Sequence, residues 1–154
     1  MIPASFGYQR PATLEEALSL LERHGEDAKL LAGGHSLLPV LKARLARPGV
    51  LIDIARIPGL SGVTKTAGGL RIGALTTHHE VESSPLVREA CPLLAEAAGR
   101  IGDVQVRNRG TLGGSAAHAD PAADYPAALL ALEAVMVAAG PGGARNIPAA
   151  EFFT

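Results

Sequence analysis

The sequence of 154 residues has little of several residue types on which common kinds of site depend. Its one cysteine, Cys91, excludes an internal disulfide, a cysteine-rich zinc site and an iron–sulfur cluster held by this chain. Tryptophan is absent and aromatic residues make up 3%, which argues against a platform that stacks nucleic-acid bases. Fourteen Lys and Arg against fifteen Asp and Glu leave a net charge of −1, so no nucleic-acid partner is expected.

Long apolar runs are also missing. The longest, residues 126–139, is interrupted by Glu133 and is shorter than the roughly 20 residues needed to cross a bilayer. The N-terminus has no basic start followed by an apolar run, so no targeting segment is expected. With 47% hydrophobic and 19% charged residues, the chain is expected to fold as a cytoplasmic protein without a membrane span.

What the sequence does have, over its first 55 residues or so, is an alternation of strand and helix patterns. Extended or apolar runs predict three short strands, over residues 6–10, 28–32 and 50–54. Thr13 is a good N-cap for a helix that Gly25 ends, and residues 37–45 predict a second helix. This order of elements indicates a small α/β lobe.

The rest of the chain predicts a mixture of hairpins and helices. Two hairpins are expected around Gly-Gly turns, residues 63–66 with 69–72 and residues 134–139 with 145–147. Helical patterns cover residues 77–81 and 92–99, and a helix capped by Asp120 is expected over part of residues 120–132. Residues 101–109 are expected to be irregular, and residues 110–115 to form a glycine-rich turn.

Two glycine pairs stand close to hydroxyl side chains. Gly33-Gly34 precedes Ser36, and Gly113-Gly114 lies between Thr111 and Ser115. Tandem glycines can turn the backbone through positive φ, so that successive N–H groups converge on a phosphate oxygen. Two such turns would suit a diphosphate. Either pair can equally be a simple turn, and neither matches the dinucleotide fingerprint GxGxxG or the P-loop.

Asp124 and the histidines leave further interpretations open. Asp124 is a candidate acceptor for a ribose hydroxyl or a flavin N–H, or simply a carboxylate in the first turn of a helix. His78, His118 and Asp120 are candidate ligands for a metal-dependent hydrolase. Against a metal, the HExxH motif is absent, and the adjacent His78 and His79 point in different directions on a helix or a strand.

Taken in order, several motifs resemble those of the FAD-binding medium subunits of molybdenum hydroxylases, the carbon monoxide dehydrogenase and xanthine dehydrogenase type. The resemblance covers essentially the whole chain and is carried by Ala32-Gly33-Gly34-His35-Ser36-Leu37-Leu38-Pro39, Leu51-Ile52-Asp53-Ile54, Ile57-Pro58-Gly59-Leu60, Ile72-Gly73-Ala74-Leu75-Thr76-Thr77-His78, Gln105-Val106-Arg107-Asn108-Arg109-Gly110-Thr111-Leu112-Gly113-Gly114-Ser115 and His118-Ala119-Asp120-Pro121-Ala122-Ala123-Asp124.

The resemblance implies an α+β, two-lobed FAD-binding fold of the vanillyl-alcohol oxidase (PCMH) type. Residues 1–56 would form the small α/β lobe, and residues 57–154 a larger mixed lobe. Noncovalent FAD would be held by two loops, with Asp124 hydrogen-bonded to the cofactor and Ile101 close to it. The cofactor-binding residues implied are Leu30, Leu31, Ala32, Gly33, Gly34, His35, Ser36, Leu37, Ile101, Thr111, Leu112, Gly113, Gly114, Ser115 and Asp124. Subunits of this family continue well past residue 154, so the second lobe is expected to be truncated at its C-terminus.

The implied function is that of an oxidoreductase subunit. A molybdenum-cofactor large subunit would oxidise the substrate, and a small 2Fe–2S subunit would pass electrons to FAD on this chain and on to an external acceptor. No side chain of this chain is expected to act as an acid, base, nucleophile or metal ligand. Two alternatives stay open: a truncated scaffold or assembly module of the same fold without flavin, and the metal-dependent hydrolase.

Overall fold

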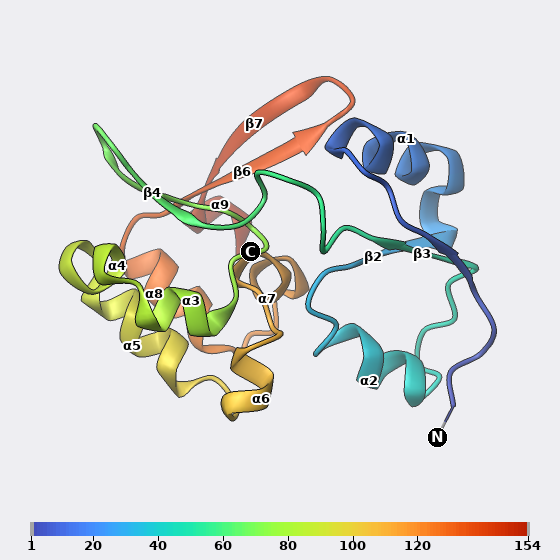
Figure 1. The fold of residues 1–154 in the computed structure, drawn as a ribbon, viewed down its shortest axis with the longest axis horizontal. Helices are drawn as coiled ribbons and strands as arrows, with labels where there is room; N and C mark the ends of the chain where they lie inside the picture. Colours follow the sequence, from blue (N-terminus) through green and yellow to red (C-terminus); the bar gives the residue numbers. More distant parts are fainter. Residues whose placement is uncertain (1, 154) are drawn as a thin grey trace. The chain divides into compact units, whose positions relative to one another are not determined.

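Three short segments near the N-terminus pair as a parallel sheet in the computed structural model, which describes residues 2–153 (Figure 1). They are β1 (Gly7–Gln9), β2 (Ala28–Leu31) and β3 (Val50–Asp53), in the order β1-β3-β2. β3 is the central strand, and its Leu51 and Ile52 are fully buried, as their continuous apolar run requires. The three predicted strands are therefore confirmed.

Two helices connect these strands. α1 (Leu14–His24) begins where the Thr13 hydroxyl accepts the Glu16 amide, and a short 3₁₀ turn, η1 (Gly25–Asp27), follows it. α2 (Leu37–Lys42) is shorter than predicted. Arg44 has a φ of 58°, and the Leu45 amide bonds back to the Val40 carbonyl, which is the hydrogen-bonding pattern that closes a helix.

Two antiparallel hairpins follow, as predicted. The first pairs β4 (Val63–Thr66) with β5 (Gly69–Ile72), and the second pairs β6 (Val135–Gly140) with β7 (Gly143–Pro148).

Seven helices accompany the hairpins in the described part of the chain. They are α3 (His78–Ser83), α4 (Pro85–Ala90), α5 (Pro92–Arg100), α6 (Val104–Arg107), α7 (Leu112–His118), α8 (Asp124–Ala131) and α9 (Ala149–Phe152). Their apolar side chains make one core, in which Val81, Val87, Ala98 and Tyr125 are fully buried.

Three predictions about these helices are wrong. α6 lies in the segment expected to be irregular, with Asp103 as its N-cap, and α7 replaces the expected glycine-rich turn. α8 begins at Asp124, because Asp120 instead closes a turn by accepting the Ala122 amide. This later start places Pro126 in the first turn, where its missing N–H breaks no helical hydrogen bond.

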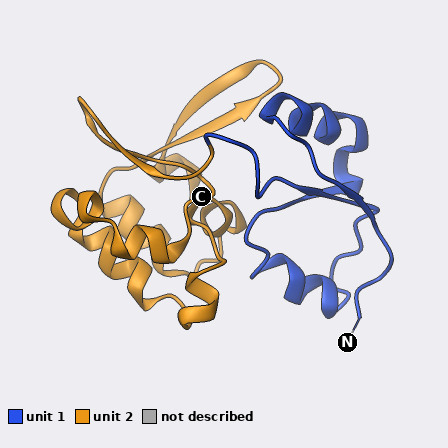
Figure 2. Cartoon of the chain, in the orientation of Figure 1, with its two compact units in different colours: residues 1–59 blue, residues 60–154 orange. Residues whose placement is uncertain are grey.

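The chain divides into two compact units, residues 1–59 and 60–154 (Figure 2). The first contains the parallel sheet, and the second contains both hairpins and their helices. The division lies three residues after the expected boundary at residues 56 and 57. Among residues 2–153, no helix is long and apolar enough to cross a membrane; the cytoplasmic location stays a prediction.

Candidate functional site

The segment Leu30–Leu37 joins the end of β2 to the start of α2 in the first unit. The Leu31 carbonyl still belongs to the sheet and accepts the Ile54 amide at 3.0 Å. The chain then turns sharply through Gly34, which has a φ of 81°. A Cβ on Gly34 would lie 3.1 Å from Leu38 Cδ1 and 3.2 Å from Leu31 Cδ1, so this turn favours glycine for two reasons.

The backbone N–H groups of this turn are free. Gly33, Gly34, His35 and Ser36 have no hydrogen-bond acceptor for these groups among residues 2–153. The Ser36 side chain is exposed and caps no helical amide, so its hydroxyl is free as well. Unpaired N–H groups beside a strand end suit the binding of an anion such as a phosphate.

The second glycine segment, Thr111–Ser115, has a different structure. Thr111 caps α7, and its hydroxyl accepts the Gly114 amide at 3.2 Å. The Leu112 amide donates to the Thr76 carbonyl at 2.9 Å, and the Gly113 amide donates to the Ala74 carbonyl at 2.8 Å. The interpretation of this segment as a cradle of converging free amides is therefore wrong: these three amides already have acceptors within the protein.

Gly113 meets a different requirement, because a Cβ there would lie 2.5 Å from the Ala74 Cβ. The glycines allow α7 to approach residues 74–76 closely, and they leave little side-chain bulk on the first turn. What this segment offers a ligand is that bare surface with the half-buried Ser115 beside it. Thr111 is 6% exposed and its hydroxyl serves the cap of α7.

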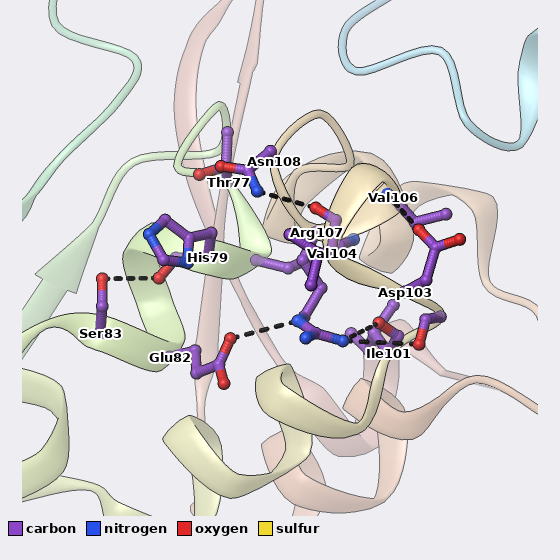
Figure 3. Close-up of polar contacts among 12 residues, drawn as sticks. Thr77, His79, Glu82, Ser83, Ile101, Asp103, Val104, Val106, Arg107 and Asn108 are labelled. Carbon is purple, nitrogen blue, oxygen red and sulfur yellow. Dashed lines mark hydrogen bonds and ion pairs between the residues drawn. The ribbon is translucent and has the colours of Figure 1, made fainter.

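Ile101 follows α5 directly and is half-buried. Its carbonyl accepts from the Arg107 guanidinium at 3.2 Å, and the Gly102 carbonyl accepts from the same nitrogen at 3.4 Å. The other face of this guanidinium pairs with Glu82 of α3, with 3.2 Å between Arg107 Nε and Glu82 Oε2 (Figure 3). Sequence reasoning missed Arg107 as the residue that holds this loop.

Asp124 is the first residue of α8, and its side chain is exposed. It lines an open, mostly apolar groove of about 370 Å³ between α5 and α8, together with the charged side chains of Glu96 and Arg100. A carboxylate here can accept hydrogen bonds from a ligand.

Tyr125 and His78 form a buried polar pair that the sequence did not indicate. The tyrosine hydroxyl lies 3.0 Å from His78 Nδ1, and the two residues are 0% and 4% exposed. Burial raises the pKa of Tyr125, and the nearby carboxylates of Asp124 and Glu82 raise it further. The hydroxyl therefore stays protonated at any physiological pH, and the pair joins α3 to the first turn of α8.

The metal-ligand candidates are not assembled. His78 packs in the interior, whereas His118, the last residue of α7, and Asp120, two residues further on, are exposed. Within residues 2–153, no three His, Cys, Asp or Glu side chains come together as a metal site would need.

A family of known domains matches nearly the whole chain. The model described as "FAD binding domain in molybdopterin dehydrogenase" matches residues 4–154. The carbon monoxide dehydrogenase medium chain of Hydrogenophaga pseudoflava is 53% identical over 153 residues, which are 99% of this chain and 53% of that protein. The 6-hydroxypseudooxynicotine dehydrogenase complex subunit alpha of Paenarthrobacter nicotinovorans is 48% identical, over 98% of this chain and 51% of that protein.

The comparison with solved structures agrees with these sequence matches. The solved carbon monoxide dehydrogenase of Hydrogenophaga pseudoflava that lacks the Mo-pyranopterin moiety superposes with a TM-score of 0.98 at 53% identity, covering 100% of this chain and 54% of that one. The chain spans about half the length of the curated relatives that it matches.

Proposed function

Because the chain belongs to the family of FAD-binding domains of molybdopterin dehydrogenases, we propose that it binds FAD as the flavin-holding part of a molybdenum-containing dehydrogenase. The observation that carries this proposal is the family match over residues 4–154. Bound FAD would supply the redox chemistry, whereas the protein supplies binding, orientation and electrostatics. The metal-dependent hydrolase is not favoured.

The architecture is proposed to be the two-lobed fold of the vanillyl-alcohol oxidase type. The parallel sheet of residues 1–59 supports its assignment as a small α/β lobe, and the hairpins and helices of residues 60–154 support a larger mixed lobe. Each lobe contributes one of the predicted glycine segments.

The residues of the first segment fit a diphosphate. The free N–H groups of residues 33–36 and the free Ser36 hydroxyl can each donate to a phosphate oxygen. The positive φ of Gly34 holds the turn that aims them, and Leu30, Leu31 and Leu37 anchor its two ends to β2 and α2. We assign Leu30–Leu37 to the cofactor site on this ground.

The second unit is proposed to contribute contacts that need no free amide. The Ser115 hydroxyl can hydrogen-bond the cofactor, and the exposed Gly114 lets it come close to the backbone. Thr111, Leu112 and Gly113 would act by holding this turn in place, through the cap hydroxyl, the core and the close approach to Ala74. The exposed Asp124 carboxylate can accept from a ribose hydroxyl or a ring N–H. Ile101 would offer apolar contact beside them, and Leu112 holds α7 in the core.

The partners belong to the same proposal. A large subunit with the molybdenum cofactor would oxidise the substrate, and a small subunit with 2Fe–2S clusters would relay the electrons to this chain. This chain would then pass them to an external acceptor, which makes it an oxidoreductase subunit that works only within the complex.

A matched pair of glycine variants tests the cofactor site. Gly34 and Gly59 have nearly equal φ values, 81° and 79°, so Gly34→Ala and Gly59→Ala are matched in backbone strain. At Gly34 the new Cβ would also lie 3.1 Å from Leu38 and 3.2 Å from Leu31, whereas at Gly59 it would meet no atom within 4 Å. Only Gly34 lies in the proposed site. Strain there would turn the N–H groups of residues 33–36 away from the diphosphate. Flavin-fluorescence titration of the full-length protein should show a Kd for FAD raised about tenfold or more by Gly34→Ala and unchanged by Gly59→Ala.

Two outcomes would count against the proposal. Equal FAD affinity of both variants would remove residues 33–36 from the site. A wild-type protein with no saturable FAD binding would instead support the scaffold without flavin.

A further inference from the structure

Two polar side chains of α3, His78 and Glu82, project from the same face of the helix. They are four residues apart, which places them one above the other. His78 is buried, at 4% exposed, and the Glu82 side chain is half-buried, at 31% exposed. Each contacts residues that adjoin or hold the cofactor segments that we assign to the second unit: Gly110 and Tyr125 for His78, and Arg107 for Glu82.

His78 contacts the residues next to two of those segments, Gly110 before Thr111 and Tyr125 after Asp124. Its amide donates to the Gly110 carbonyl at 3.0 Å, and Thr77 and Thr111 form a β-bridge beside this bond. A Cβ on Gly110 would lie 2.5 Å from His78 Nε2, so the ring packs directly on the backbone that leads into α7. Its Nδ1 lies 3.0 Å from the hydroxyl of Tyr125, the residue that follows Asp124.

Glu82 contacts the third segment through Arg107. This ion pair is largely withdrawn from water, because the Arg107 side chain is 17% exposed. The Nη1 of the same guanidinium donates to the Ile101 and Gly102 carbonyls (Figure 3). A planar group that is fixed by a carboxylate on one side can hold two carbonyls in place on the other.

We propose that α3 is the positioning element for the cofactor segments of the second unit, with His78 setting Thr111–Ser115 and Asp124 through Gly110 and Tyr125, and Glu82 setting Ile101 through Arg107. This inference rests on the proposed function. His78 and Glu82 are positioning residues and touch no cofactor themselves. Binding residues act at full strength only when neighbouring side chains hold them in the productive geometry, so breaking either link weakens FAD binding.

The test uses three variants of the full-length protein. Tyr125→Phe and Glu82→Gln are nearly isosteric with the wild type, and Glu82→Ala removes the carboxylate. Tyr125→Phe removes only the hydroxyl that bonds His78, and Glu82→Gln keeps an oxygen for Arg107, whereas Glu82→Ala keeps none. We expect Tyr125→Phe and Glu82→Ala each to raise the Kd for FAD about tenfold, and Glu82→Gln to raise it less. Both weakened variants should also change the visible circular dichroism of bound FAD, because its surroundings shift.

Val87→Ala is the matched control. Val87 lies in α4, outside the positioning helix, and is fully buried in the same core, but its side chain has no polar link to a cofactor segment. It should lower the melting temperature and leave the Kd for FAD within about twofold of wild type.

The outcomes separate this inference from the proposed function. A wild-type protein that binds no FAD overturns both. A wild-type protein that binds FAD, with Tyr125→Phe and Glu82→Ala binding equally well and giving the same dichroism, overturns the positioning role alone. A Val87→Ala variant that weakens FAD binding as much as they do also overturns it, since loss of stability would then explain every effect.

Discussion

Gly113 is the position in α7 where one added methyl group is expected to cost most. A Cβ there would lie 2.5 Å from the Ala74 Cβ and 2.8 Å from both the Ala74 Cα and its carbonyl oxygen. Ala74 has no flexible side chain that could move aside, so α7 itself must shift and stretch the 2.8 Å bond from the Gly113 amide.

The expected magnitude is the difference between two effects. Overpacking costs up to about 3 kcal/mol, and replacing a helical glycine by alanine returns about 1 kcal/mol. Gly113→Ala should therefore lose about 2 kcal/mol of unfolding free energy, which lowers the melting temperature of a chain of this size by about 4–8 °C. Thermal melts followed by far-ultraviolet circular dichroism measure this shift.

The next glycine is the control for this prediction. Gly114 lies in the same helical turn but is exposed, so Gly114→Ala should show only the gain in helix propensity. Its melting temperature should rise by about 2–4 °C. If Gly113→Ala melts at or above the wild type, the close approach between α7 and residues 74–76 does not exist as described.

The Tyr125 hydroxyl and the two helix caps give the remaining predictions. Because the pKa of Tyr125 is raised in the folded chain and is about 10 in the unfolded chain, only the unfolded state loses this proton just above pH 10. Stability should then fall by up to about 1.4 kcal/mol per pH unit. Denaturant unfolding should show that Tyr125→Phe makes this slope shallower, and a slope equal to that of the wild type would contradict the reasoning. Thr13→Ala and Thr111→Ala each delete a cap hydroxyl 3.2 Å from its amide and should each cost about 1 kcal/mol of stability. Only Thr111→Ala should also raise the Kd for FAD, and equal FAD affinities would remove the Thr111 hydroxyl from the site.

Local signals in the sequence predicted much of the fold. The apolar run of β3 indicates a buried parallel strand, and Thr13 and Gly25 mark the two ends of α1. β2 forms where a strand was predicted, but the expectation that it is buried is wrong, because Lys29 and Leu30 are exposed. These features depend on neighbouring residues alone. The family match over residues 4–154 likewise confirms the resemblance that the ordered motifs carried.

The sequence predicted poorly where tertiary contacts decide the structure. Two adjacent glycines disfavour a helix, yet α7 forms because Thr111 caps it, Ala74 and Thr76 accept its first amides, and the core buries Leu112. The Asp120-Pro121 pair has the pattern of a helix start, but a proline further along the chain moves that start to Asp124.

The polar pairs could not have been predicted either. His78 and Tyr125 are separated by 47 positions, and Glu82 and Arg107 by 25, counted from their residue numbers. Nothing in the local sequence of either pair indicates its partner. Their importance follows only from where α3 packs.

The most direct test of the central claim is the amount of flavin that the protein carries. The freshly purified full-length protein is denatured, and the released cofactor is identified and quantified against the protein concentration. The account predicts FAD, approaching one molecule per chain once the protein has been saturated with added cofactor. A colourless protein that takes up no FAD at any concentration would contradict it.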